Sequence, residues 1–293
     1  MNIKPSVGLF YRVFLLYYLM RERYLHINED IKLEIYTKKY NVILDNMDIN
    51  EYTIRPISVI MYLQDAFARL CATKKMAAYD LFKPNQYWIV TEFNINFADN
   101  LPFWSEEIEV SIWISEITKL KIYTDYEISY KNKTFAKGNA LWFIIDRKTK
   151  RPVKTDEASK RFEVVNNLVL GKHQKFILPE IKEKVRKINH TNNLSDLDFN
   201  NHVNNKSYIN IAEMTSTNEF KSKHSLSSIN IRFNKETYLG DTLNCTTYKT
   251  DKENQYVHLI EKDGESVCDI STVWEEKTYN TAITNADLDV ISE

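Results

Sequence analysis

Apolar and polar residues alternate strictly in several stretches of the chain, which predicts antiparallel β-strands with one buried face. The clearest alternation is at residues 92–97 (EFNINF) and 228–233 (SINIRF). Each of these stretches follows a segment with the apolar spacing of a helix, at residues 57–71 and 203–215. Further strands are predicted after each stretch, at residues 119–131, 134–145, 255–262 and 265–274.

The same order of elements occurs twice, with a period of roughly 130 to 150 residues, which indicates a duplicated domain. Each copy opens on D-x-N-x followed by an aromatic ring, from Asp48 to Tyr52 and from Asp198 to His202. We therefore predict one long helix followed by about five antiparallel strands in each copy, with helix and sheet packed as two layers. A curled antiparallel sheet wrapped around one helix is the hot-dog arrangement. The predicted class is α+β, a double hot-dog of two tandem domains.

The segments around the two copies complete the predicted domain organisation. A Lys-rich stretch is expected to link the copies and to cross the outer face of the sheet. The apolar run from Val13 to Met20 is too short to span a bilayer, and Arg12 and Arg21 make it a poor signal peptide. We expect an appendage or an over-extended gene start with Met20 as the true beginning; an interfacial helix is the alternative. The predicted parts are 1–35 (N-terminal appendage), 36–153 (N-terminal hot-dog domain), 154–187 (linker), 188–276 (C-terminal hot-dog domain) and 277–293 (C-terminal tail).

Composition excludes several classes of function. Apolar residues make up 43% of the 293 residues and charged residues 27%, as in a globular protein with a full core. Five glycines are too few for the phosphate-binding loops of nucleotide-binding folds, and a net charge of −1 attracts neither nucleic acid nor an anionic membrane. Three dispersed cysteines predict reduced thiols in a cytoplasmic protein, and the His and Cys spacing predicts no metal and no cofactor.

The two copies differ where chemistry is expected. Tyr52 in the first copy stands where the second has His202, an imidazole that can transfer protons near neutral pH. Attack on a thioester carbonyl creates an oxyanion, and the N–H groups of residues 200–205, predicted to lie at a helix N-terminus, would bind it. Asp198 would act as a base toward water or as a direct nucleophile, and Asn200 would donate to the carbonyl or orient water. His202 would hold the carboxylate and shuttle a proton.

A structural interpretation of the same residues stays open. D-x-N before a helix is also an ordinary N-cap and Asx-turn, and the first copy uses it without a histidine. His202 alone can be a buried imidazole whose hydrogen bonds are satisfied within the core. Spacing by itself therefore does not separate the two interpretations.

The segment DLDFNNHVNNKSYINIAEM, at 196–214, resembles the signature D-x-N-x-H-V-N-N-x-x-Y of the acyl-acyl carrier protein (acyl-ACP) thioesterases of bacteria and plant plastids. YLQDA at 62–66 and ALWFIIDRKTKRPVK at 140–154 are similar to further segments of that family. The resemblance implies that the first domain binds the acyl chain and the second catalyses. It carries catalytic roles to Asp198, Asn200, His202 and Glu236. Thr237 stands where plant members have a cysteine, which excludes a cysteine nucleophile and favours a carboxylate mechanism.

The function expected from this resemblance is hydrolysis of the fatty acyl-ACP thioester, which releases free fatty acid and ends chain elongation. Acyl carrier protein is the expected partner, with no nucleic acid and no stable membrane insertion, and the enzyme is expected to be a monomer or homodimer. The alternatives are an acyl-CoA thioesterase and a non-catalytic acyl-binding protein; a hydratase fits less well.

Acyl carrier protein is acidic, so a basic surface is expected to steer it. The two candidate runs are Arg147, Lys148, Lys150 and Arg151, and Lys182, Lys184, Arg186 and Lys187. Such runs are also common on solvated faces without a partner. The depth of the acyl pocket is expected to depend on Met61, Phe67 and Trp88.

Overall fold

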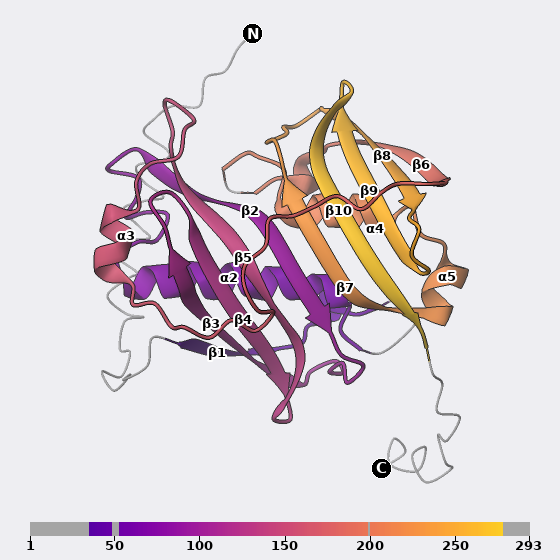
Figure 1. The fold of residues 1–293 in the computed structure, drawn as a ribbon, viewed down its shortest axis with the longest axis horizontal. Coiled ribbons are helices and arrows are strands. Elements are labelled where there is room, and N and C mark those ends of the chain that lie inside the picture. The colour runs from indigo at the N-terminus through magenta and orange to yellow at the C-terminus, as the bar shows by residue number, and fades with distance from the viewer. Residues whose placement is uncertain (1–34, 49–52, 199, 278–293) are drawn as a thin grey trace. The chain divides into compact units, whose positions relative to one another are not determined.

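The computed structural model of the protein describes residues 35–48, 53–198 and 200–277. Across these residues the chain forms one antiparallel sheet to which each copy contributes five strands (Figure 1). The strands of the first copy are β1 (Tyr36–Asn41), β2 (Gln86–Phe97), β3 (Glu107–Ile117), β4 (Ile122–Tyr130) and β5 (Lys133–Asp146). Those of the second are β6 (Lys184–Thr191), β7 (His224–Phe233), β8 (Thr242–Lys249), β9 (Gln255–Lys262) and β10 (Glu265–Glu276).

The strand order shows the duplication directly. It runs β1-β3-β4-β5-β2 in the first copy and continues as β7-β10-β9-β8-β6 in the second, so the second half repeats the first in reverse. The copies meet where β2 pairs antiparallel with β7, and Asn94 lies opposite Asn230. These two asparagines occupy equivalent positions in the aligned repeat, so a pseudo-twofold axis passes between them. The predicted double hot-dog is confirmed.

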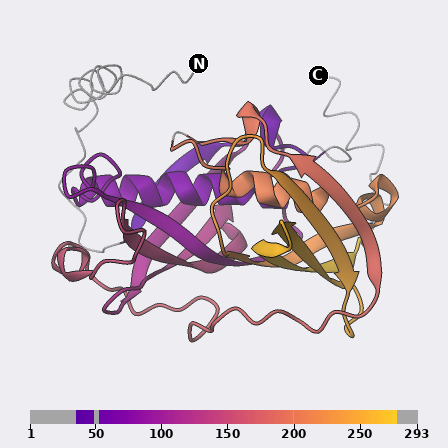
Figure 2. The same cartoon turned by 90° about the horizontal axis from the view of Figure 1, so that it is seen from above.

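The main helix of each copy lies on the same face of this sheet (Figure 2). In the first copy α2 (Val59–Thr73) follows the short 3-10 helix η2 (Pro56–Ser58), and in the second α4 (Asn205–Glu213) is followed by α5 (Asn218–Lys223). Two more 3-10 turns, η1 (Leu44–Asn46) and η3 (Leu194–Asp196), follow β1 and β6. The apolar face of α2 supplies much of the first core, through Val59, Ile60, Leu63, Ala66, Phe67 and Leu70.

Two details of the predicted elements were wrong. One strand of each copy, β1 or β6, precedes the helix, and four strands follow it. The second helix is not long, because α4 has nine residues and ends before a run of hydroxyl side chains. Thr215 Oγ1 donates to the Ala212 carbonyl at 2.6 Å, and Thr217 caps α5 by accepting from the Phe220 N–H. Hydroxyls that bond local backbone compete with a continuous helix.

The segment between the copies crosses the sheet face opposite the helices, along the predicted path (Figure 2). It begins with α3 (Asp156–Arg161), and β6 starts at Lys184, inside the range expected to be linker. The crossing is held by side chains of the first copy: Trp113 Nε1 donates to the Asn167 carbonyl, and His173 stacks on Tyr123. The extended part of the linker is therefore packed against the sheet.

The predictions for the N-terminal appendage, including the run from Val13 to Met20, lie outside the described residues, as does the C-terminal tail beyond residue 277. The same holds for residues 49–52 of the first D-x-N motif. Within the described ranges, no helix is long and apolar enough to cross a membrane.

Candidate active site

Asp198 and His202 lie in one tight loop between η3 and α4. Leu197 and Val203 form an antiparallel bridge, and the Asp198 N–H donates to the His202 carbonyl at 2.8 Å. Asn201 takes a φ of 61°, the left-handed conformation that asparagine tolerates better than most residues. Asp198 Oδ1 accepts the N–H groups of Asn200 and His202 at 2.8 and 3.2 Å. The aspartate thus shapes the loop that presents the histidine, as in the Asx-turn interpretation.

The expected oxyanion role of the backbone at residues 200–205 was wrong for most of that segment. Helix α4 begins only at Asn205, and Asn204 is its N-cap, accepting from the Lys206 N–H. The N–H groups of residues 200–204 all donate within the chain. Those of residues 200 and 202 donate to Asp198 Oδ1, and that of residue 201 donates to the Asp198 carbonyl. Those of residues 203 and 204 donate to the carbonyls of Thr237 and Asp196. Because these donors are occupied, the side-chain amide of Asn200, which is partly exposed, becomes the better candidate donor to an oxyanion.

His202 and Glu236 are brought together by a backbone contact between their segments. The Val203 N–H donates to the Thr237 carbonyl at 3.0 Å, which fixes the loop of His202 beside the segment after β7. His202 Nδ1 then lies 3.5 Å from Glu236 Oε1. This distance is longer than an ordinary hydrogen bond, so the two side chains face each other closely without one. The Tyr238 ring packs edge-on against the imidazole, with centroids 5.4 Å apart.

The first copy also contributes to this cluster, which the sequence reasoning missed. Tyr87, at the start of β2, donates from Oη to Glu236 Oε1 at 3.0 Å. Lys150, in the turn after β5, places Nζ 3.3 Å from Glu236 Oε2. The sequence predicts Lys150 only as part of a docking surface, and Tyr87 carries no signal in the sequence.

The charges around Glu236 favour its ionised form. Burial raises the pKa of this carboxyl, but His202, Tyr87 and Lys150 together outweigh burial and hold the pKa below its ordinary value. Glu236 can therefore accept a hydrogen bond from an imidazole and stabilise its positive charge.

Thr237 and the three cysteines fill structural positions. The Thr237 hydroxyl is fully buried and lies 2.8 Å from Tyr208 Oη and 3.2 Å from Asn192 Nδ2. Cys71, Cys245 and Cys268 are also buried. Burial raises the pKa of the Cys245 thiol to about 12 and raises those of the other two well above the ordinary value. Thiols of this kind are poor nucleophiles.

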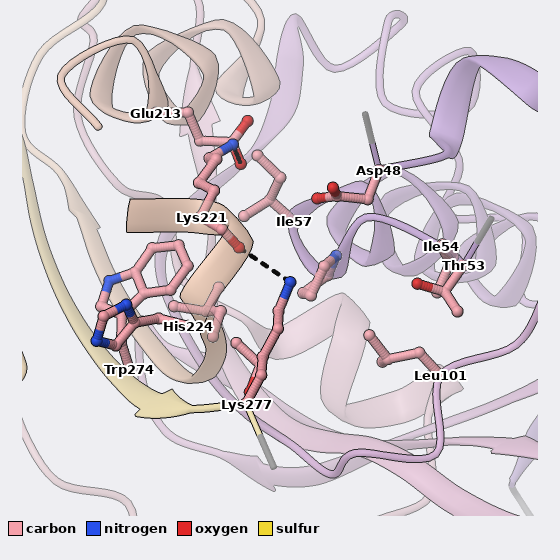
Figure 3. A pocket seen from close by; sticks show the side chains of 13 residues that line it. Asp48, Thr53, Ile54, Ile57, Leu101, Glu213, Lys221, His224, Trp274 and Lys277 are labelled. Carbon is pink, nitrogen blue, oxygen red and sulfur yellow. Dashed lines mark hydrogen bonds and ion pairs between the residues drawn. The ribbon is translucent and has the colours of Figure 1, made fainter. Parts of the chain in front are cut away.

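A cavity of about 40 Å³ lies between the copies (Figure 3). Among the described residues that line it, none belongs to the loop of His202. Residues of both copies line it, among them Ile57, Leu101 and Trp274. Glu213 at its edge pairs with Arg55 of the first copy at 3.5 Å and with Lys221 at 2.8 Å. At this volume the cavity does not have room for a fatty acyl chain. Among the described residues no group of three or more His, Cys, Asp and Glu side chains could hold a metal ion.

Two of the residues expected to bound the acyl pocket lie together inside the first copy. Phe67 stacks on Trp142 with ring centroids 3.7 Å apart and meets Trp88 edge-on at 5.2 Å. Met61 is partly exposed on α2. Their role in setting pocket depth stays a prediction.

Comparison with known proteins assigns the family. The model of the acyl-ACP thioesterase N-terminal domain matches residues 33–162, and that of the C-terminal domain matches residues 180–276. The chain belongs to the acyl-ACP thioesterase family, as the motif at 196–214 indicated.

Individual relatives agree with this assignment. The chain is 26% identical over 247 residues to a chloroplastic acyl-[acyl-carrier-protein] hydrolase of Cuphea viscosissima, covering 80% of this chain and 57% of the relative. It is 26% identical over 225 residues to a chloroplastic palmitoyl-acyl carrier protein thioesterase of Arabidopsis thaliana, covering 69% and 53%. The chain thus spans little more than half the length of these curated relatives.

Solved structures share the fold. An acyl-ACP thioesterase from Bacteroides thetaiotaomicron superposes with a TM-score of 0.73 at 19% identity, covering 83% of this chain and 98% of the other. The 12:0-ACP thioesterase from Umbellularia californica gives 0.72 at 16% identity, covering 84% and 99%.

Proposed function

We propose that this protein hydrolyses the thioester of fatty acyl-ACP and releases the free fatty acid. The observation that carries the proposal is the approach of His202 to the ionised Glu236 in a loop shaped by Asp198. The membership in the acyl-ACP thioesterase family and the names of the curated relatives support the same substrate class.

The proposed reaction assigns one role to each side chain. Water attacks the carbonyl carbon, and the His202 imidazole takes the proton of the water while Glu236 stabilises the imidazolium. The Asn200 amide donates to the oxyanion. The C–S bond then breaks, and the imidazolium returns the proton to the departing thiolate of the carrier. Asp198 holds the loop through Oδ1, and its Oδ2 is the atom that would orient the water or, in the alternative order, attack the carbonyl itself.

The basic run at residues 147–151 is the better docking surface for the carrier. Arg147 lies over the rings of Tyr87 and Phe82, and Lys150 contacts Glu236, so this run borders the proposed site. The other run is largely on β6, the outermost strand of the second half. A carrier bound at residues 147–151 would place its thioester beside His202.

Reversing Lys148 and Arg151 to Glu is expected to raise KM for acyl-ACP several-fold and to leave kcat nearly unchanged. Both side chains are exposed, so they aid encounter and not chemistry. Added salt should weaken the wild-type reaction in the same way, because exposed charges are screened beyond about 8 Å at physiological ionic strength. The measurement is steady-state kinetics on acyl-ACP and on the matched acyl-CoA at several salt concentrations.

The matched control reverses Lys184 and Arg186 on β6, which changes net charge by the same amount. A larger effect from that pair would move the docking surface to β6. Equal efficiency on both carriers, with neither reversal mattering, would make the protein an acyl-CoA thioesterase, the second candidate.

Replacing Cys71, Cys245 and Cys268 together by Ala is expected to leave most of the turnover, since their buried thiols have raised pKa values and lie outside the proposed site. Turnover of the triple variant and of iodoacetamide-treated wild type would be compared, with circular dichroism as a check of folding. Lost turnover in a folded variant would restore a thiol nucleophile.

A further inference from the structure

The turn after β5 holds a lysine in a conformation that favours glycine. Asp146 Oδ1 accepts the N–H groups of Lys148 and Thr149 at 3.0 and 2.7 Å, and the Lys150 N–H donates to the Asp146 carbonyl at 2.9 Å. Lys150 consequently takes a φ of 56°. Backbone geometry alone would be better served by glycine, since a Cβ is strained in the left-handed region. Lys75 and Lys131 take the same backbone conformation, so what sets Lys150 apart is where its side chain lies.

The side chain of Lys150 leaves the turn toward the second copy. Its Nζ lies 3.3 Å from Glu236 Oε2 and 3.2 Å from Tyr87 Oη, and 5.1 Å from the centre of the Tyr87 ring. The lysine and the tyrosine therefore contact one another and the same carboxylate. More than half of the Lys150 side chain is exposed, so this ion pair adds little to stability.

Each oxygen of Glu236 is engaged from two sides. Oε1 accepts from Tyr87 and faces His202, and Oε2 receives Lys150 and Tyr238 Oη, the last at 3.3 Å. Four groups on both copies thus define the plane of the carboxylate and the direction in which Oε1 points. A carboxylate held in this way orients an imidazole better than a freely rotating one.

We propose that Lys150 and Tyr87, both from the first copy, are positioning residues that hold Glu236 toward His202. The catalytic centre is then complete only where the two copies pack against each other. This inference rests on the proposed thioesterase function. It separates Lys150 from its neighbours Lys148 and Arg151, whose expected role is carrier docking.

Lys150→Met is expected to lower kcat about tenfold, the scale of one lost hydrogen bond to a charged group. The loss should be equal on acyl-ACP and on an acyl-N-acetylcysteamine thioester, which has no carrier to dock. The acid limb of kcat/KM should move to higher pH, because the removed cation no longer opposes protonation of the site that Glu236 forms with His202, Tyr87 and Tyr238. Lys150→Arg should have a higher kcat than Lys150→Met. Tyr87→Phe should lower kcat, as Lys150→Met does.

Two further variants distinguish positioning from folding and from charge. Lys150→Gly should melt no lower than wild type, because glycine suits the turn, and should still lose turnover as Lys150→Met does. Lys154→Met changes an exposed lysine four residues further along the chain, with the same charge change, and should leave kcat on the small thioester unchanged.

Several outcomes overturn the inference. If Lys150→Met changes only the KM for acyl-ACP, Lys150 is a docking residue. If the pH profile of Lys150→Met is unchanged, Lys150 does not act on Glu236. If the wild type is active on both substrates and Lys150→Met has an unchanged kcat, the inference is overturned while the proposed function stands. A wild type inactive on both overturns the proposed function and the inference with it.

Discussion

Asp198→Asn, Asn200→Ala and His202→Ala are each expected to lower kcat for acyl-ACP hydrolysis by about 100-fold or more in a folded protein. Losing one acid–base or oxyanion contributor has effects of this size. Asp198→Asn is the sharpest of the three. An asparagine Oδ1 can still accept the N–H groups of Asn200 and His202, so the loop stays while the charge is lost. The measurements are kcat on acyl-ACP and the melting temperature of each variant.

Asp196→Asn is the matched control for this set. Asp196 lies two residues away and pairs with His190 at 2.9 Å, a closer approach than that of His202 to Glu236. It also accepts the Asn193 N–H in a capping box. Its loss should lower the melting temperature and leave kcat nearly unchanged. Near-native turnover in Asp198→Asn would contradict the assignment of the site.

Gly138→Ala is expected to destabilise the fold by about 3 kcal/mol, at the upper end of overpacking effects. Gly138 lies opposite Tyr126 on β4 and Ile95 on β2. A Cβ at this position would overlap the Asn94 carbonyl oxygen and come within 2.6 Å of Tyr126 Oη. Tyr126 Oη donates to that same carbonyl at 2.9 Å, so neither neighbour can move without losing a bond next to the junction of the copies. Urea unfolding measures the change.

Gly264→Ala provides the comparison. Gly264 has a φ of 79° in the β9–β10 turn, and a Cβ there would meet nothing within 4 Å. Its cost should be about 1 kcal/mol, from backbone conformation alone. If Gly138→Ala unfolds at the same urea concentration as Gly264→Ala or wild type, the packing of β5 against β2 is not as described.

The strands and the duplication were predictable because their signals are local. Alternation at 92–97 and 228–233 reports a half-buried strand regardless of the rest of the chain, and both stretches lie in β2 and β7. Comparing the two copies then indicated which carries the histidine. The strands before the helices were missed because β1 and β6 have few apolar residues and no fully buried one. They are held by antiparallel pairing with β3 and β8.

The composite nature of the site was not predictable in this way. Tyr87 and Lys150 lie 149 and 86 residues before Glu236, and no pattern in the sequence couples such distant positions. Nor did the motif at 196–214 show that Asp196, Asp198 and Thr237 accept the backbone N–H groups of residues 200–204. These contacts depend on how β2, β7 and the loops pack, which only the folded structure shows.

The most direct test of the account is hydrolysis of a panel of fatty acyl-ACPs by the purified wild-type protein. Free fatty acid and the thiol of the carrier would be measured together, with matched acyl-CoAs and buffer alone for comparison. The account predicts equal amounts of the two products, faster release from acyl-ACP than from acyl-CoA, and loss of release in His202→Ala. A folded protein that releases neither product from any acyl-ACP above the buffer rate would contradict it.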